Sequence, residues 1–237
     1  MDGPFSFTKD EANMFGLTVL TMVVVYFLYA WRSTDLTVAS GIVFGITLLA
    51  YIGGIHLVAR LLQKNRAYRR GYDAVYKNTW PALAITFALS FFSFGALPLL
   101  APGSVELTHD PRRRLGQFRY GLNLKDLAAA AVIPSLIGVL VTFIVRFFYV
   151  SPTKTPFVFT LLLFSILYSF FNLLPIPSFD GLHIFFYSRI QYVFLLVFVC
   201  MFGILVLFTA YFALIIAFLV AIFAAGYFFI KVDKQQF

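Results

Sequence analysis

The chain has 237 residues, of which 61% are hydrophobic and 12% are charged. Soluble domains are typically about 45–50% apolar and about 25% charged, so this composition excludes an ordinary soluble protein and is typical of a chain embedded in a bilayer. The net charge of +8 is first a signal of membrane topology and of contact with membrane lipid. We predict no nucleic-acid partner, because the basic residues flank apolar segments. The single cysteine, Cys200, excludes an internal disulfide and a cysteine-based metal site.

Seven apolar segments follow one another along the chain. They cover residues 12–31, 36–62, 80–100, 126–149, 156–174, 190–208 and 209–230. Since a spanning helix needs roughly 20 mostly apolar residues, we predict an all-α polytopic membrane protein with about six transmembrane helices. The start of the chain is acidic and lacks a cleavage site, which favours a retained first helix over a secretory signal.

The predicted organisation is a single membrane-embedded domain over residues 1–237, because no stretch is long and polar enough to form a soluble domain. Its core covers about 36–185, and residues 190–230 form a C-terminal helical hairpin. The last two apolar segments are joined almost without a polar break, so we expect a tight turn near residues 209–211.

The third segment, 80–100, lies between two basic stretches at 63–79 and 101–125. The positive-inside rule places both stretches in the cytoplasm, which is impossible if the segment crosses the membrane once. Gly95 and Pro98 interrupt it, and non-helical backbone at membrane depth is tolerated where protein shelters it. We therefore predict a re-entrant or short β element at about 80–100, with a seventh span as the alternative. Six spans place both termini in the cytoplasm of a multi-pass cell-membrane protein.

The most informative string begins at Asn172 and reads Asn-Leu-Leu-Pro-Ile-Pro-Ser-Phe-Asp-Gly. Pro175 and Pro177 remove two backbone donors and end the preceding helix, while Gly181 permits a turn that few other residues adopt. The break holds Asn172 and Asp180, and a carboxylate at the membrane edge is a candidate functional residue. The alternative is that Asp180 only caps the following helix.

This string resembles the asparagine, proline, proline, Leu-Asp-Gly motif of the site-2 proteases, the intramembrane zinc metalloproteases of peptidase family M50. Three other stretches are similar in order and spacing to archaeal members: Phe5-Ser6-Phe7 with Glu11, Leu57-Val58-Ala59-Arg60, and Trp80 to Val105. In that family, two histidines of a His-Glu-x-x-His pair and the motif aspartate hold zinc, and the glutamate is the general base. The resemblance, over about residues 5–185, implies that Asn172 and Asp180 are the site residues and that Asp180 faces the helical turn from Tyr51 to Ile55.

The zinc-binding pair is missing from this chain. Aligned on residues 57–60, Tyr51, Ile52 and Ile55 stand where histidine, glutamate and histidine belong. The chain has three histidines, His56, His109 and His183. Asp180 alone does not supply the three protein ligands of a catalytic zinc site, and Ile52 accepts no proton. The resemblance thus implies a catalytically inactive pseudoprotease without zinc or another cofactor, which binds transmembrane segments of other proteins as a scaffold, a chaperone or a competitor of an active relative.

Two alternatives stay open at this point. His56, Asp180 and His183 would form a displaced three-ligand metal site if their helices met. The protein would then be an active metalloendopeptidase that binds zinc through atypical ligands. A small transporter, or a structural subunit of a membrane complex, built on the broken helix at 172–181 is the second alternative. The metal content of the purified protein separates the first alternative from the pseudoprotease.

Four further features carry smaller predictions. Gly41 and Gly45 lie on one helix at a spacing that permits close approach of another helix. Arg146, near the outer end of its helix, is expected to snorkel to the membrane interface. The run Arg112–Arg114 reads as a topology signal, with binding of anionic headgroups as the alternative. His109 is expected to be solvated.

Overall fold

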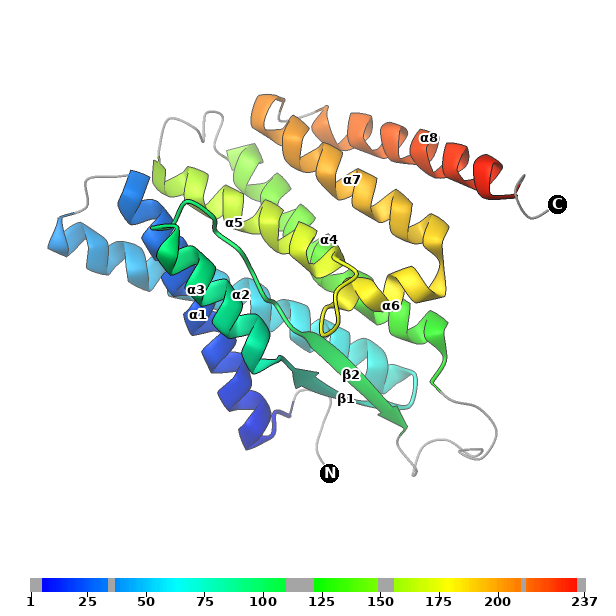
Figure 1. The fold of residues 1–237 in the computed structure, drawn as a ribbon, viewed down its shortest axis with the longest axis horizontal. Helices are drawn as coiled ribbons and strands as arrows, with labels where there is room; N and C mark the ends of the chain where they lie inside the picture. Colours follow the sequence, from blue (N-terminus) through cyan, green and yellow to red (C-terminus); the bar gives the residue numbers. More distant parts are fainter. Residues whose placement is uncertain (1–5, 34–36, 110–121, 149–155, 210–211, 234–237) are drawn as a thin grey trace.

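The structure is a computed structural model that describes residues 6–33, 37–109, 122–148, 156–209 and 212–233. The described elements are, in chain order, α1 (Lys9–Ser33), α2 (Val38–Arg69), β1 (Tyr72–Lys77), α3 (Trp80–Phe92), β2 (Ser104–His109), α4 (Leu124–Phe148), α5 (Pro156–Leu173), α6 (Asp180–Tyr187), α7 (Arg189–Phe208) and α8 (Ala213–Asp233). Six of the helices, namely α1, α2, α4, α5, α7 and α8, are long and apolar enough to cross a membrane (Figure 1). The predicted all-α polytopic membrane protein with six candidate spans is therefore confirmed.

The first two helices begin at polar caps and then run far. At the start of α1, the backbone N–H of Thr8 donates to Glu11 Oε2 at 2.9 Å, and the N–H of Glu11 donates to Thr8 Oγ1 at 3.3 Å, which is a capping box. The 32 residues of α2 give a length of roughly 48 Å, against a hydrocarbon core of about 30 Å. The helix continues past the predicted end of the apolar segment at 62, and its last turn carries Arg66 and Arg69.

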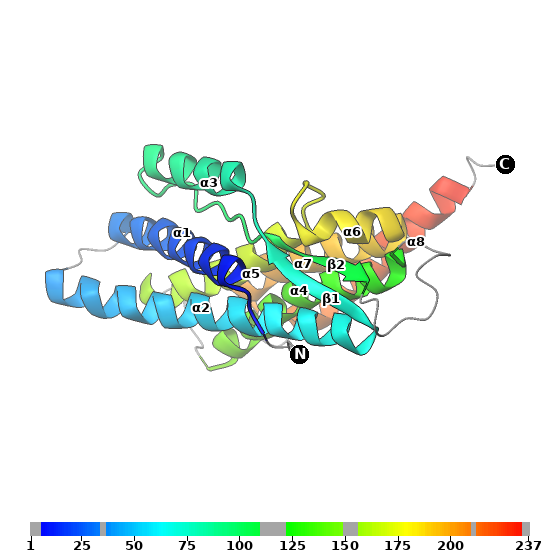
Figure 2. The same cartoon turned by 90° about the horizontal axis from the view of Figure 1, so that it is seen from below.

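The predicted re-entrant element is present. The strands β1 and β2 pair in antiparallel register, with Tyr72 opposite His109 and Lys77 opposite Ser104. Between them, α3 has only 13 residues, a length of roughly 20 Å that does not span a bilayer. The chain therefore leaves and returns at one place, beside α1 (Figure 2). The two strands that close this element lie just outside the predicted segment 80–100, before and after it in the chain.

The turn after α3 is held tightly against α1. Gly95 has a φ of +75°, and a Cβ at this position would lie 2.6 Å from the backbone carbonyl of Leu28. Only glycine combines this left-handed conformation with so close a contact. The interruption read from the sequence at Gly95 is thus the point at which the re-entrant segment docks on a spanning helix.

Two apolar clusters hold the helices together. One joins α1, α2 and α5, and includes Tyr26, Leu48, Phe164 and Tyr168. The other joins α4, α6, α7 and α8, where the buried Ala213, Ala217 and Ala221 repeat along one face of α8. Helices α7 and α8 lie side by side (Figure 1), and the tip of their hairpin at 210–211 is outside the described residues.

The closest described glycine contact between spans is not the one suggested by the sequence. A Cβ at Gly41 or Gly45 would meet the ring of Phe27 at 3.9 and 3.7 Å, which is ordinary van der Waals contact. At Gly138 of α4, by contrast, a Cβ would collide with the side chain of Ser169 and lie 2.9 Å from Ser165 O of α5. Close approach therefore depends on Gly138.

The prediction that Arg146 snorkels is wrong. Its side chain is 7% exposed, and its Nε donates to Val206 O at 2.9 Å. Val206 lies in the last turn of α7, where carbonyl groups have no partner within their own helix. Arg146 thus donates a hydrogen bond to a carbonyl group at the end of a neighbouring helix. The run 112–114 and the side chain of His109 lie outside the described part of the chain, so the predictions about them stay predictions.

Candidate functional site

The break after α5 places Asp180 at the first residue of α6. Phe179 is the residue that precedes the helix, and it makes no side-chain cap. Asp180 is therefore not the helix cap, and that alternative is wrong. The left-handed residue of the loop is Ser178, with a φ of 73°, whereas Gly181 is helical. A Cβ at Gly181 would collide with the carbonyl of Leu173, so this glycine is needed for close packing of α6 on the end of α5 and not for a turn.

The carboxylate of Asp180 is buried against an arginine of α2. The Arg60 Nη1 atom lies 2.6 Å from Asp180 Oδ2, and the two side chains are 0% and 1% exposed. Arginine and aspartate are almost never fully buried unless they are paired. The sequence separation of 120 residues makes this ion pair a tertiary contact that fixes the motif on α2.

Four more oxygen atoms surround the same guanidinium. Nη1 also donates to Gln63 Oε1 at 2.6 Å, and Nη2 donates to Pro102 O at 2.8 Å, to Gly103 O at 3.0 Å and to Asn172 Oδ1 at 3.3 Å. These acceptors come from α2, from the segment that returns from α3, and from the end of α5. One buried cation therefore joins α2, the segment that returns from α3, and the broken helix after α5.

Neighbouring hydrogen bonds hold the acceptors around Arg60 in place. Asn172 Nδ2 donates to Tyr168 O at 2.7 Å, and Gln63 Nε2 donates to Ala130 O of α4 at 3.1 Å. The guanidinium carbon lies 5.2 Å from the centre of the Tyr76 ring, a distance at which a ring face attracts a cation. Arg60 Nε is buried and has no acceptor among the described residues.

Tyr76 connects the Arg60–Asp180 pair to the re-entrant element. Its hydroxyl lies 3.0 Å from both Pro102 O and Thr18 Oγ1, and its single proton is donated to one of them. Burial raises the pKa of this hydroxyl above its usual value of 10.0, so the group stays a neutral donor at physiological pH.

The positions that the resemblance assigns to the zinc pair are packed against other helices. Tyr51 OH lies 2.6 Å from Ser165 Oγ of α5. Ile52 and Ile55 are 0% and 8% exposed, and they belong to the core shared by α1, α2 and α5. The residues present do not fit zinc, because two alkyl side chains and a hydrogen-bonded phenol supply no ligand set.

His56 lies in the core and not at a membrane interface. It is fully buried; its Nδ1 lies 3.0 Å from Tyr168 OH and its Nε2 lies 3.4 Å from Tyr76 OH. His183 is half-buried on α6. Among the described residues, no group of three or more histidine, cysteine, aspartate or glutamate side chains is placed to hold a metal ion. The structure thus does not gather the three ligands of the displaced site.

A second buried ion pair lies beside the first. Lys64 Nζ is 2.7 Å from Glu11 Oε1, and the two side chains are 4% and 3% exposed. The same carboxylate oxygen accepts the backbone N–H of Tyr76 at 2.7 Å, and Lys64 also donates to Ser6 O at 2.8 Å. This pair joins the start of α1, the basic end of α2 and β1.

Sequence reasoning missed the partners of both acids, although a signal was available. His56, Arg60 and Lys64 repeat at intervals of four on α2, so they lie on one face of the helix. A face that carries cations within an apolar helix indicates buried acceptors opposite it. It does not indicate which acceptors, because these come from distant parts of the chain.

Comparison of the chain with protein-family models, with curated proteins and with solved structures finds no match. The fold and the site therefore define the class: a helical membrane protein with six candidate spans in its described part, a re-entrant element, and a buried arginine–aspartate pair at a broken helix.

Proposed function

We propose that the protein is a site-2-protease-like membrane protein in which Arg60 takes the place of zinc, and that it binds transmembrane segments of other proteins without cleaving them. In this proposal it is a multi-pass protein of the cell membrane with both termini in the cytoplasm. The observation that carries the proposal is the ion pair of 2.6 Å between Arg60 and Asp180, the aspartate that the resemblance assigns to zinc.

The charge balance of the site supports this assignment. A buried carboxylate that loses its metal is left as an unpaired charge, which costs several kcal/mol. The guanidinium of Arg60 removes that cost, and it also binds the motif residue Asn172. A metal ion would have to displace a hydrogen-bonded cation before it reached Asp180, so the site disfavours metal binding.

The absence of hydrolytic chemistry follows from the neighbouring residues. Metalloproteolysis needs a metal-bound water and a base that takes its proton. Ile52 stands where the base belongs, and its side chain is fully buried. His56, one turn further along α2, has both ring nitrogens within hydrogen-bond distance of tyrosine hydroxyls, at 3.0 Å from Tyr168 OH and 3.4 Å from Tyr76 OH. The proposal rests on the part of the pattern that the chain carries, the broken helix with Asn172 and Asp180.

The proposed binding is tested by site-specific photocrosslinking. A photoreactive residue replaces Ile176, which is 45% exposed in the loop before α6, and in a control protein replaces Phe223, which is 77% exposed on α8. The purified proteins are reconstituted with labelled single-span peptides. We expect saturable crosslinking from Ile176, competed by unlabelled peptide, and only weak, unsaturable crosslinking from Phe223.

Metal analysis of the same preparations is the second arm. We expect no stoichiometric metal in the wild-type protein. One tightly bound metal ion per chain that is lost on Asp180→Ala or His56→Ala would overturn the proposal in favour of the displaced metal site. Equal crosslinking from Ile176 and Phe223 would contradict the proposal that the protein binds transmembrane segments at the broken helix.

A further inference from the structure

The exposed face of α2 changes from apolar to basic near the end of the helix. Val58 and Leu62 are 49% and 44% exposed, and Arg66 and Arg70, which continue the same row at intervals of four, are also exposed. Residues four apart lie on one side of a helix. On a spanning helix, exposed aliphatic side chains face the acyl chains of lipid, and basic side chains extend to the headgroups. The row therefore passes from acyl chains to headgroups between Leu62 and Arg66.

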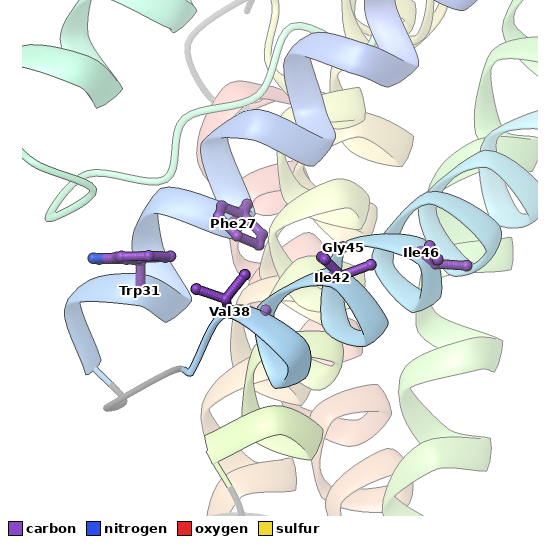
Figure 3. Close-up of a pocket in the computed structure, with 7 residues that line it drawn as sticks. Phe27, Trp31, Val38, Ile42, Gly45 and Ile46 are labelled. Carbon is purple, nitrogen blue, oxygen red and sulfur yellow. The ribbon is translucent and has the colours of Figure 1, made fainter.

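The other end of α2 has no such basic residues. There, Val38 and Ile42 line an apolar pocket together with Phe27 and Trp31 of α1 (Figure 3). The charged residues of the helix begin only at Arg60. The cations of α2 are thus gathered at one end, and an anionic ligand of this helix is to be sought there.

The start of α4 adds a fourth exposed cation to this end of α2. Arg70 Nε lies 3.7 Å from Oδ1 of Asp126, and the residue before Asp126 is the exposed Lys125. Arg69 is exposed as well, in the same turn of α2 as Arg66 and Arg70. We call Arg66, Arg69, Arg70 and Lys125 the basic surface. It is formed by the end of one candidate span and the start of another.

The positive charge of the basic surface is mostly unpaired. Among the described residues it makes one ion pair, between Arg70 and Asp126, and Arg70 is 60% exposed in this pair, so the contact contributes little. The arginines offset the dipole of α2 at its C-terminus, but Lys125, in the first turn of α4, has the unfavourable sign for its own helix. An anion bound at this place would be stabilised by the arginines, by Lys125 and by the N-terminus of α4.

We propose that the basic surface binds the phosphate of an anionic membrane phospholipid whose acyl chains lie along Val58 and Leu62. A guanidinium presents five N–H donors in a fork that matches phosphate oxygens, and Arg66 and Arg69 are close enough on the helix to share one phosphate. The charge of the surface favours an anionic headgroup, and the adjoining aliphatic row favours a lipid over a soluble phosphate. The site is separate from the buried ion pair at the broken helix and does not depend on the function proposed above.

The test is a titration of the full chain, purified in mild detergent, with phosphatidylglycerol and with phosphatidylcholine that carry the same fluorescent acyl chain. We expect tighter binding of phosphatidylglycerol. Arg66→Gln combined with Arg69→Gln should weaken this binding by roughly 25-fold, because each basic residue near the headgroups contributes about five-fold in affinity. The matched control is Arg189→Gln combined with Lys231→Gln, which removes two exposed positive charges from α7 and α8 and should bind like the wild type.

Lys125→Gln is the second variant, for which we expect about five-fold weaker binding, and it keeps the test decisive if the arginine variant does not fold. Arginines that only stabilised the end of α2 would lower the Tm in lipid-free detergent and leave the affinity for phosphatidylglycerol unchanged. That result would overturn the inference, as would equal affinities for the two lipids or equal losses in the arginine variant and its control. Displacement of the labelled lipid by glycerol phosphate at the same concentration would also overturn it, because the site would then bind phosphate without the acyl chains.

Discussion

Replacing Arg60 by methionine removes the cation of the buried pair and keeps a side chain of similar length. Asp180, at 1% exposure, is then left as a buried charge, and the carbonyl groups of Pro102 and Gly103 lose the donor that they share. Breaking a buried ion pair by removing one partner costs about 3–5 kcal/mol. At about 2–4 °C for each kcal/mol in a chain of this size, the Tm should fall by roughly 6–20 °C.

The assay is thermal unfolding in detergent, in which the reaction of Cys200 with a maleimide dye reports the unfolded fraction. The matched control is Arg66→Met, an exposed arginine on the same helix, for which we expect a change within about 0.5 kcal/mol. Arg60→Met combined with Asp180→Leu removes both charges and should cost less than the sum of the single changes. Equal Tm values for Arg60→Met and Arg66→Met would refute the view that the pair holds the motif.

Two other predictions concern the re-entrant element and the motif glycine. Cysteines introduced singly at Asp73 and Thr108, which face each other in the β ladder, in a protein without the native cysteine, should both react with a membrane-impermeant maleimide from the cytoplasmic side; reaction from opposite sides would contradict the re-entrant topology. Gly181→Ala should lower the free energy of unfolding by about 1–3 kcal/mol, because the new Cβ collides with the carbonyl of Leu173. Gly226→Ala on α8, where a Cβ meets no atom within 4 Å, should have no destabilising effect, and equal stability of the two alanine variants would disprove the contact.

The spans and the re-entrant element could be predicted from the sequence because both depend on local composition. A helix is the conformation in which an uninterrupted apolar run of about 20 residues satisfies its backbone groups within its own segment in lipid. The two basic stretches around 80–100 then favour a re-entrant element over a single crossing. The paired strands β1 and β2 agree with this reasoning, and the end of α2 departs from it, because its basic residues extend the helix beyond the apolar segment.

The side-chain partners, by contrast, were decided by the tertiary structure alone. The sequence led us to expect that Arg146 snorkels, whereas in the structure its Nε donates to the carbonyl of Val206 at 2.9 Å. Gly181 looked like a turn residue, but the packing of α6 on the end of α5 makes it a contact residue.

The same holds for the candidate site. The sequence by itself singled out Asp180 as a candidate functional residue, and the resemblance implied that the histidine and glutamate ligands are missing. It did not determine that Arg60, 120 residues away, lies 2.6 Å from that acid. The physical reason is that a charge in an apolar segment must find an acceptor, which local sequence makes evident, whereas the identity of the acceptor depends on which helix faces meet. In this chain the meeting of α2, the returning re-entrant segment and the broken helix after α5 brings the oxygen atoms around one guanidinium.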